Sequence, residues 1–340
     1  MGANPDANFV RRIGIAFNIK TDHNLEEQAE FDEPETIAAI DNALKIAGYE
    51  TVLLEATAGF PQKLEEGKPD IVFNIAEGKS GRNREAQVPA ILEYYGIPYT
   101  GSDAAALSIA LDKALTKQIV KSCGVKAPAS FEINDRLLVS ADDIVFPVLL
   151  KPNAEGSSKG ISDICVADDT YKLRELIGEM THSYGSDLLL ESYIDGREFT
   201  VGLLGNGSDT VVFEPMEIIY RKSRGPYNIY SYEVKKNYKE YISYRCPPDI
   251  SESLRNEMIC AAKTIYDTLR CADFARIDFR LSEDENLFFI EINPLPGLAP
   301  GYSDYIMLAQ YNGISYNALI GKILHSALKR FGMKAVGKDD

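Results

Sequence analysis

Apolar runs and amphipathic stretches alternate through the first hundred residues of this 340-residue chain. Three short runs rich in isoleucine, valine and leucine predict buried β-strands at residues 12–17, 50–54 and 70–74. Two stretches with apolar residues at helical spacing predict α-helices at residues 34–48 and 85–95. Strands that alternate with helices in this way predict an α/β fold with a doubly wound parallel sheet.

The pattern changes beyond residue 100. A helical stretch at 102–124 precedes a smaller strand–helix unit that extends to about residue 190. Further strands are expected at 199–204 and 211–217, and further helices at 250–269 and 316–331. Residues 225–241 are polar, rich in tyrosine and without a clear period, so we expect a long functional loop that covers a site.

The acidic segment 26–35 follows the first predicted strand. Loops at the carboxyl ends of parallel strands form the ligand-binding edge of such sheets. We therefore expect residues 26–35 to lie at a binding site.

A pair of apolar segments near the C-terminus carries three oxygen-bearing side chains. Asp278 lies on the first segment, Glu291 and Asn293 lie on the second, and a short acidic turn joins them at residues 282–286. Residues i and i+2 of a strand share a face, and a hairpin partner can place Asp278 beside them. With Arg276 close by, these oxygens are suited to a Mg²⁺–phosphate site. A merely solvated hairpin face is the alternative, but Pro294 and Gly297 end the strand instead of continuing it.

A second candidate site begins at the strand that ends in Lys151. It leads into a loop, 153–162, that is rich in glycine and serine. Glycines allow the backbone to approach a phosphate, and clustered N–H groups and hydroxyls form an anion site. The loop lacks the G-x-x-x-x-G-K-[ST] pattern of a P-loop, and an ordinary flexible surface loop would look similar. Together with the distant carboxylate hairpin, it predicts a nucleotide held between two lobes.

Composition narrows the class of protein. The formal net charge of −15 argues against general nucleic-acid binding, which needs a basic surface. The sequence contains no run of 18 apolar residues and no apolar leader at its N-terminus, so we expect no membrane span and no signal peptide. The five cysteines are scattered, which favours reduced thiols in a cytoplasmic protein. The three histidines are also scattered, which gives little support to a histidine-based catalytic triad.

In number, order and spacing, the chain's motifs resemble the ATP-grasp superfamily and, within it, the D-alanine–D-alanine ligases and their relatives. The resemblance covers nearly the whole chain. The matching segments are Tyr99-Thr-Gly-Ser102, Asp112-Lys113-x-x-x-Lys117, Val148-Leu-Leu-Lys151-Pro152, Glu155-Gly-Ser-Ser-x-Gly160, Leu190-Glu191-x-Tyr193-Ile194-x-Gly196-x-Glu198-Phe-Thr-Val201, Arg276-Ile-Asp278 and Glu291-x-Asn293-x-x-Pro-Gly297.

The resemblance implies a three-domain ATP-grasp architecture in which two α+β lobes clamp ATP. It places an N-terminal α/β domain at 1–103, a central lobe at 104–190 and a C-terminal catalytic lobe at 191–340, with a lid loop at 224–242. The implied activity is that of an ATP-dependent carbon–nitrogen ligase, which joins small amino-acid-like substrates through an acyl phosphate. It also implies a role in peptidoglycan synthesis for the cell wall, and a homodimer formed through the first domain.

The resemblance also implies a role for each matching residue. Lys113 and Lys151 correspond to the lysines that bind the ATP phosphates, and Ser157 and Ser158 lie in the phosphate loop. The adenine segment corresponds to Glu191, Tyr193 and Ile194, and the ribose carboxylate to Glu198. Asp278, Glu291 and Asn293 correspond to ligands of Mg²⁺ or Mn²⁺. Arg276 and the backbone N–H of Gly297 correspond to the oxyanion donors, Lys235 reaches the γ-phosphate, and substrate contacts are assigned to Glu33, Lys236 and Ser303.

Three departures from the family pattern fall at the amino-acid site. The glycine-rich segment with its glutamate is missing after the first strand, where Asp32 or Glu33 is a candidate replacement. A His-Gly pair usually follows the strand at 71–74, but residues 74–82 contain no histidine, and the usual Lys-Tyr pair of the lid is Lys235-Lys236. These departures suggest a relative with a changed substrate, while a divergent D-alanine ligase is the simpler alternative.

Three functions therefore stay open. The first is a ligase that joins two amino acids, or an amino acid and a related acid. The second is a ligase that tailors a secondary metabolite or a peptide. The third is an inactive nucleotide-binding protein, against which the retention of Arg276 counts, because binding alone does not need an oxyanion donor.

Overall fold

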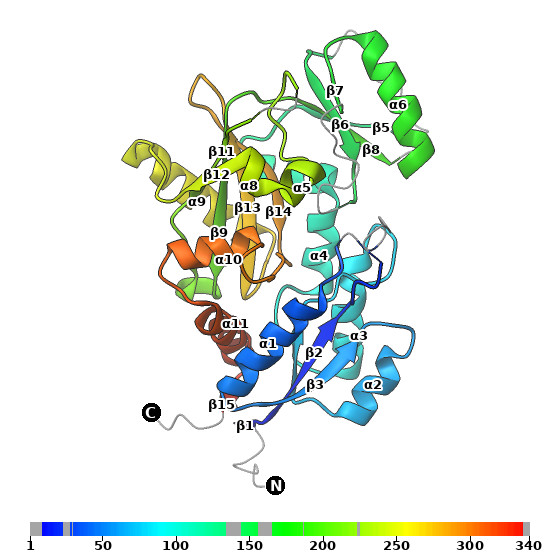
Figure 1. The fold of residues 1–340 in the computed structure, drawn as a ribbon, viewed down its shortest axis with the longest axis vertical. Coiled ribbons are helices and arrows are strands. Elements are labelled where there is room, and N and C mark those ends of the chain that lie inside the picture. The colour runs from blue at the N-terminus through cyan, green and yellow to red at the C-terminus, as the bar shows by residue number, and fades with distance from the viewer. Residues whose placement is uncertain are drawn as a thin grey trace.

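The computed structural model describes residues 9–22, 28, 30–133, 144–155, 165–185, 187–222 and 225–335. Figure 1 shows an N-terminal α/β domain, a small lobe that carries one long helix, and a larger lobe built on the longest strands. Ser157 and Ser158 fall in the segment 156–164, which lies outside the described residues.

The N-terminal domain contains a three-stranded parallel sheet in the order β3 (Glu50–Glu55), β2 (Arg12–Phe17), β4 (Ile71–Asn74). Helices α1 (Pro34–Ile46) and α11 (Tyr316–Arg330) pack on one face. Helices α2 (Phe60–Gly67) and α3 (Gln87–Tyr95) pack on the other, and a 3₁₀ turn, η2 (Arg84–Ala86), precedes α3. Every residue of β2 except Arg12 is buried. The doubly wound parallel sheet expected from the sequence is confirmed.

The central lobe begins with two consecutive helices, α4 (Ala104–Leu111) and α5 (Lys113–Ser122). The sequence pattern predicts one continuous helix here, and that prediction is wrong. Asp112 has extended backbone angles, and its carboxylate accepts a hydrogen bond from Leu115 N at 3.0 Å. An aspartate that caps a new helix in this way ends the preceding one.

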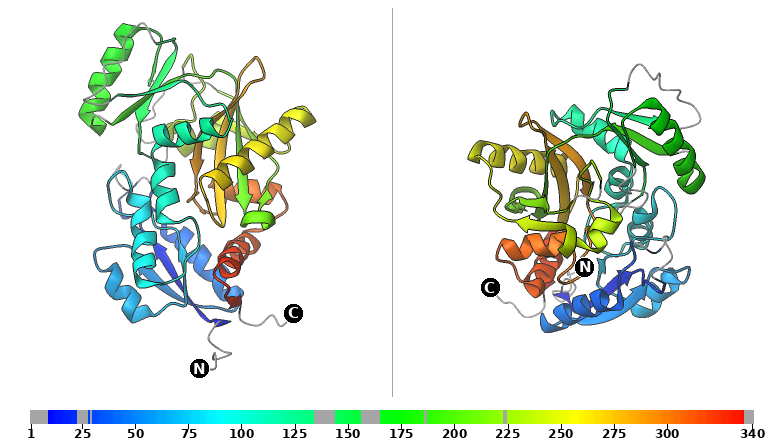
Figure 2. Two further views of the ribbon diagram at one scale, coloured as in Figure 1. Left: turned by 180° about the vertical axis from the view of Figure 1, so that it is seen from behind. Right: turned by 45° about the horizontal axis from the view of Figure 1, so that its top comes forward.

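The sheet of the central lobe is antiparallel. Its order is β5 (Ser130–Ile133), β8 (Leu188–Ser192), β6 (Val148–Pro152), β7 (Val166–Ala167). Helix α6 (Thr170–Tyr184) contributes Leu173, Leu176 and Met180 to the core that covers β6 and β8. Figure 2 shows this lobe standing above the N-terminal domain and beside the larger lobe.

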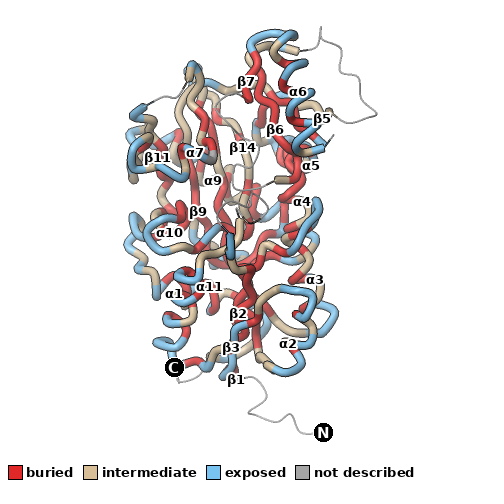
Figure 3. The backbone as a smooth tube through the Cα atoms, turned by 45° about the vertical axis from the view of Figure 1, so that its right-hand side comes forward, coloured by how far each residue is buried: buried red, intermediate tan, exposed pale blue. Residues whose placement is uncertain are grey.

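The larger lobe contains a six-stranded antiparallel sheet. Its order is β12 (Ile242–Arg245), β11 (Met216–Tyr220), β9 (Arg197–Leu204), β13 (Phe274–Leu281), β14 (Leu287–Asn293), with β10 (Val211–Val212) paired to β9. Helix α9 (Glu252–Thr268) covers one face, and α10 (Asp304–Tyr311) and α11 pack on the other. Buried residues concentrate along these strands in Figure 3.

The single strand expected at 211–217 is two strands in the structure, so that prediction is wrong. Pro215 has no N–H to give to a ladder, and it separates β10 from β11. The pattern also did not predict α2 and α10, which are only eight residues each. The remaining predicted strands and helices lie within a few residues of their expected bounds.

The tyrosine-rich segment at 224–242, here called the lid segment, contains two short helices, α7 (Tyr232–Lys236) and α8 (Tyr238–Tyr241). Ser231 caps α7 by accepting a hydrogen bond from Val234 N at 3.4 Å. Val234 packs with Ile218 and Ile242, and several tyrosines surround this cluster. The lid segment is therefore anchored on β11 and β12.

The two ends of the described chain meet. β1 (Phe9–Val10) pairs in parallel with β15 (Lys334–Ala335), which joins the N-terminal domain to the larger lobe. Arg330 strengthens the same junction, because it donates to Asp273 Oδ2 at 2.7 Å and to the carbonyl of Gly101 at 3.0 Å. Among the residues that the structure describes, no helix is both long and apolar enough to cross a bilayer.

Gly202 in the middle of β9 tests the packing of the larger lobe. A Cβ atom at this position would lie 2.5 Å from Phe213 Cδ2 and 3.2 Å from Tyr305 Cε2, and neither ring can move freely. Gly202→Ala should therefore lower the free energy of unfolding by about 1–3 kcal/mol, as measured by urea denaturation.

Gly178→Ala is the matched control. Gly178 lies inside α6 with nothing within 4 Å of its Cβ position, so alanine should be neutral or slightly stabilising there. Equal stability of the two variants would contradict the packing described for β9.

Candidate active site in the cavity between the lobes

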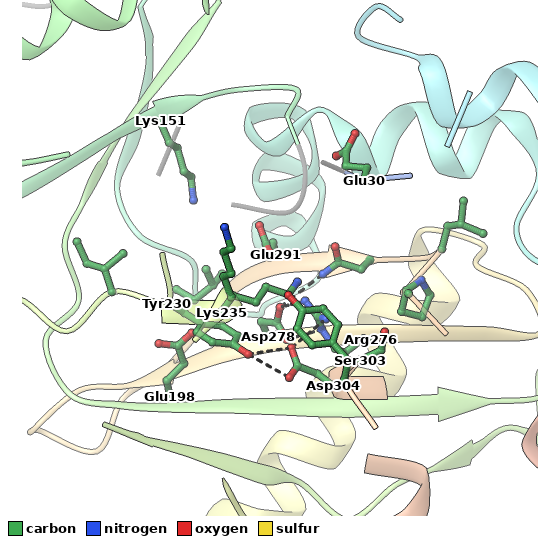
Figure 4. A pocket seen from close by; sticks show the side chains of 18 of the residues that line it. Glu30, Lys151, Glu198, Tyr230, Lys235, Arg276, Asp278, Glu291, Ser303 and Asp304 are labelled. Carbon is green, nitrogen blue, oxygen red and sulfur yellow. Dashed lines mark hydrogen bonds and ion pairs between the residues drawn. The ribbon is translucent and has the colours of Figure 1, made fainter. Parts of the chain in front are cut away.

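A cavity of about 490 Å³ lies where the three parts of the molecule meet. The N-terminal domain contributes residues between Lys20 and Glu85, and the central lobe contributes Lys151 and the end of β8. The larger lobe contributes β13, β14 and the loop that leads into α10, and the lid segment contributes Tyr230, Lys235 and Lys236. Figure 4 shows these side chains converging from several elements.

The carboxylate hairpin forms as the sequence predicts. In the antiparallel pair β13–β14, Asp278 lies opposite Glu291, and Arg276 lies opposite Asn293. A register shift follows directly after Asp278. Asp278, Glu291 and Asn293 therefore face the cavity together, and all three are half-buried.

Arg276 is buried between two carboxylates. Its Nε and Nη2 donate to Asp278 Oδ1 and Oδ2 at 3.1 and 2.8 Å, and its Nη1 donates to Asp304 Oδ2 at 3.4 Å. Burial alone would lower the pKa of this guanidinium, but Asp278 and Asp304 raise it above its ordinary value. Arg276 is therefore a fixed positive charge at the cavity wall.

Glu291 faces a concentration of positive charge. Burial alone would raise the pKa of its carboxyl group, but Lys113, Lys151 and Arg276 lower it to about 2. Glu291 is ionised at every physiological pH. Together with the carboxylate of Asp278 and the amide oxygen of Asn293, it forms a set of hard oxygen donors that is suited to Mg²⁺.

The protein side chains alone do not form a complete metal cage. Within the described ranges, no group of three or more His, Cys, Asp or Glu side chains is arranged to hold a metal ion. The candidate set here has two carboxylates and one amide, so the remaining ligands of an ion would have to come from water and phosphate. This is the usual manner in which proteins bind Mg²⁺.

The expected phosphate-binding lysines lie at the other wall. Lys151 donates to Glu191 Oε1 at 2.6 Å, and Lys113 donates to the carbonyl of Glu155 in the loop 153–162. Lys113 does not line the cavity itself, but its charge acts on Glu291. The structure therefore brings both lysines toward the carboxylate hairpin.

Lys117, to which the sequence motifs assigned no role, joins two lobes. It is 1% exposed, lies 3.3 Å from Glu191 Oε2, and also donates to the carbonyl of Ile290 on β14. Burial lowers the pKa of Lys117 to about 8, although Glu191 opposes this shift. Its position four residues after Lys113, on the same face of α5, was the available signal. Lys117 ties the central lobe to the larger lobe.

The carboxylate of Glu191, expected near adenine, is thus held between Lys151 and Lys117. Burial alone would raise its pKa, and the two lysines lower it. Tyr193 and Ile194 continue from Glu191 along the cavity wall.

Arg280 organises the part of the cavity where ribose binding was expected. Its guanidinium donates to the carbonyl of Ile194 at 2.8 Å and to Glu198 Oε2 at 3.0 Å, and it lies 5.1 Å from the ring centre of Tyr193. Tyr220 OH also donates to Glu198, at 2.7 Å. Arg280 was not predicted from the sequence, although it follows Arg276 and Asp278 on the same face of β13.

The candidate catalytic groups of the loop and the lid segment also reach the cavity. Gly297 lines it, and a Cβ atom there would lie 3.0 Å from Ser303 Oγ, so a side chain at this position would crowd Ser303. Ser303 accepts a hydrogen bond from Ala299 N at 3.0 Å. Burial lowers the pKa of Lys235, and the charge of Arg276 adds to this effect. Lys236 lies at the rim.

The N-terminal domain adds an acidic wall. Glu33 lies 3.4 Å from Lys20, and both line the cavity together with Asp32. Glu30 belongs to the acidic segment 26–35 that was expected at a binding site, although it was not singled out. Arg84 Nε and Nη2 donate to its two carboxylate oxygens at 2.8 and 2.7 Å. Arg84 also donates to the carbonyl of Ala154, so this pair links the N-terminal domain to the central lobe.

A fold in which a lysine-bearing lobe faces a carboxylate-bearing lobe across such a cavity defines an ATP-grasp protein. A family model described as "D-ala D-ala ligase C-terminus" matches residues 124–325. The chain is 33% identical over 292 residues to the D-alanine–D-alanine ligase of Aquifex aeolicus, covering 84% of this chain and 92% of that protein. This chain belongs to the D-alanine–D-alanine ligase family, whose members are ATP-dependent carbon–nitrogen ligases.

Two further likenesses were found. The uncharacterized protein y4sG of Sinorhizobium fredii is 34% identical over 297 residues, covering 85% of this chain and 86% of that protein. A solved structure of the D-alanine–D-alanine ligase from Bacillus anthracis superimposes with a TM-score of 0.75 at 23% identity, covering 94% of this chain and 98% of that one. This second likeness shows the fold alone.

The raised pKa of Asp32 predicts how the stability of the protein depends on pH. Burial raises its pKa from 3.8 to about 7, with Lys20 opposing and Glu33 adding to the shift. The folded state therefore holds this proton more tightly than the unfolded chain does. The stability that results is fully present below about pH 4 and is lost as the pH rises through about 7. Asp32→Asn cannot ionise, so it should raise Tm at about pH 8 and leave Tm at about pH 4 nearly unchanged.

Thermal melts at the two pH values measure this effect. Asp284→Asn, in the exposed turn between β13 and β14, is the control and should change neither melt. A lower Tm for Asp32→Asn at the higher pH would show that the ionised Asp32 carboxylate stabilises the fold.

Proposed function

We propose that this protein is an ATP-dependent ligase that joins the carboxylate of one amino-acid-like substrate to the amine of another. The observation that carries the proposal is the arrangement on β13 and β14, where Arg276 lies beside Asp278, Glu291 and Asn293 and faces Lys151 across the cavity. A bound nucleotide would have Lys151 and Lys113 on one side of its phosphates and the carboxylates of β13 and β14 on the other side. One solved structure with this fold, a D-alanine–D-alanine ligase from Bacillus anthracis, is a complex with ATP.

The reaction divides into two steps. The substrate carboxylate oxygen attacks the γ-phosphorus of ATP, the bond to the β-phosphate oxygen breaks, and ADP leaves. The amine of the second substrate then attacks the acyl carbon, and collapse of the tetrahedral species releases inorganic phosphate and a proton. No protein nucleophile is required, so the protein acts by positioning and by neutralising charge.

Each proposed residue has a defined part. Asp278, Glu291 and Asn293 would hold Mg²⁺, which neutralises charge on the phosphates when bound. Lys151 and Lys113 bind the phosphates, and Lys235 approaches the γ-phosphate from the lid segment. Arg276 and the N–H of Gly297 would donate to the oxyanion that forms on the acyl carbon and so stabilise it.

The part of the cavity lined by Glu77 and Lys236, here called the substrate wall, favours a substrate other than D-alanine. Glu77 lines the cavity in the segment 74–82, which has no histidine where the family pattern has a His-Gly pair, and the exposed Lys236 lines it where that pattern has tyrosine. The acids next to Lys236 in sequence have other partners: Glu240 pairs with Lys222 at 2.7 Å, and Glu233 accepts from Asn237 at 2.8 Å. A charged Lys236 at the rim would favour a substrate with an added carboxylate or hydroxyl at that position.

A substrate screen tests the function. Single and paired D- and L-amino acids and hydroxy acids are supplied with Mg·ATP, and both phosphate release and product mass are read. Phosphate release that depends on an added acid, with a condensed product, supports the ligase. Stabilisation by Mg·ATP with no turnover on any pair would favour an inactive nucleotide-binding protein.

Two substitutions should separate binding from chemistry. Glu291→Gln should weaken Mg²⁺ binding and abolish acyl phosphate formation. Arg276→Ala should leave the Kd for Mg·ATP nearly unchanged and lower kcat by about 10²–10³-fold, which is the usual effect of losing an oxyanion donor. Calorimetry and steady-state kinetics provide the two readouts.

Arg255→Ala is the control for these substitutions, because Arg255 pairs with Glu214 away from the cavity. It should alter neither binding nor kcat. Arg276→Ala with wild-type turnover would remove Arg276 from the mechanism.

Lys236→Tyr tests the substrate wall. If Lys236 faces the first substrate, the natural protein should make D-alanyl-D-alanine poorly, and Lys236→Tyr should raise kcat/KM for D-alanine. Lys239→Tyr, at an exposed position on α8, is the control. Efficient D-alanyl-D-alanine synthesis that Lys236→Tyr does not change would instead support a divergent D-alanine ligase.

A further inference from the structure

The carboxylate of Asp304 accepts hydrogen bonds from three separate parts of the larger lobe. Tyr230 OH of the lid segment lies 3.1 Å from Oδ1, Tyr244 OH of β12 lies 2.9 Å from the same atom, and Arg276 Nη1 of β13 lies 3.4 Å from Oδ2. Asp304 is 2% exposed, at the first position of α10. Figure 4 shows Asp304 between Tyr230 and Arg276 at the cavity wall.

The two tyrosines are reliable donors. Burial raises the pKa of Tyr230 well above its ordinary value, and Asp304 adds to this effect. Burial and Asp304 also raise the pKa of Tyr244. Both hydroxyls therefore keep their protons. Their oxygens lie 3.0 Å apart, so the two hydroxyls contact each other as well as Asp304.

Arg276 needs a second anchor for the chemistry proposed above. Its Nε and Nη2 now contact Asp278, the same carboxylate that is proposed to hold Mg²⁺. An ion at Asp278 would compete with the guanidinium for those oxygens. Asp304 contacts a different nitrogen of Arg276, Nη1, and this contact remains available when the Asp278 carboxylate turns to an ion.

We propose that Asp304 is a positioning residue that couples the lid segment to Arg276. When the lid segment is packed as described, Tyr230 and Tyr244 fix the carboxylate of Asp304, and that carboxylate holds Arg276 for the acyl-transfer step. The oxyanion donor is then correctly placed only while the lid segment covers the cavity. This inference rests on the proposed function for the role of Arg276, whereas the link from the lid segment to Asp304 rests on geometry alone.

The first test measures the link itself and needs no turnover. Hydrogen exchange is followed by mass spectrometry across residues 224–242 in wild-type protein, Asp304→Asn and Tyr230→Phe. Both variants remove a buried hydrogen-bonded partner with little change in shape, so exchange in the lid segment should be at least about fivefold faster.

Two control variants match the chemistry of these changes elsewhere in the same lobe. Asp273→Asn alters a fully buried carboxylate that pairs with Arg330 at 2.7 Å. Tyr266→Phe removes a buried hydroxyl that donates to the carbonyl of Gly205 at 2.9 Å. Both controls should lower the overall stability, yet neither should speed exchange in the lid segment beyond the rest of the protein.

The second test separates the two chemical steps with D-alanine and Mg·ATP as the probe. Oxygen-18 scrambling within ATP reports the phosphoryl transfer, and dipeptide formation reports the acyl transfer. Asp304→Asn should keep scrambling and the KM for ATP within about twofold, and should lower the kcat of dipeptide formation by about 10²-fold. Tyr230→Phe combined with Asp304→Asn should cost little more than Asp304→Asn alone.

The outcomes are distinct. Equal loss of scrambling and dipeptide formation in Asp304→Asn would overturn the proposal, because that is the behaviour of a merely structural residue. Unchanged exchange in the lid segment would also overturn it. Wild-type protein that does not scramble ATP with D-alanine would contradict D-alanine as substrate, and the exchange experiment would still decide whether Asp304 holds the lid segment.

Discussion

The site depends on one buried charge, the guanidinium of Arg276. A charge removed from water is tolerable only when opposite charges and hydrogen bonds surround it, and Asp278 and Asp304 provide both. The antiparallel pairing of β13 with β14 then determines the rest, because it places Glu291 opposite Asp278 and Asn293 opposite Arg276. A change in this register would move the carboxylates to the wrong face of the sheet.

At the opposite wall of the cavity, which carries Lys151, buried charges are also stabilised by opposite charges, but here two lysines surround one carboxylate. Lys151 and Lys117 are buried, and the single carboxylate of Glu191 pairs with both and offsets part of their positive charge. Phosphates that approach Lys151 would compete with Glu191 for its ammonium group, and Glu191 would keep Lys117 as its second partner. The cavity is therefore charged on both walls before any ligand enters, so binding a nucleotide and its metal exchanges existing ion pairs for new ones. Preorganised charge of this kind costs little rearrangement during the reaction.

The sequence predicted the local features well. The hairpin that carries Asp278 and Glu291 was predictable because a short turn and period-two alternation determine which residues face each other. Contacts such as Arg84 with Glu30, Lys117 with Glu191 and Asp304 with Arg276 join segments far apart in the chain, and no local pattern specifies them. The two wrong predictions have local causes, since Asp112 caps a new helix and Pro215 interrupts a strand.

The central claim is that ATP activates a substrate carboxylate at Arg276 and the β13–β14 carboxylates. The most direct measurement supplies the acid that supports turnover with both carboxylate oxygens labelled by oxygen-18, together with unlabelled Mg·ATP, an amine and unlabelled water. An acyl phosphate transfers one labelled oxygen to the released inorganic phosphate, and mass spectrometry should find that single label together with ADP. Unlabelled phosphate would show that water attacks ATP directly, and label recovered in AMP would show an acyl adenylate; either result would contradict the account.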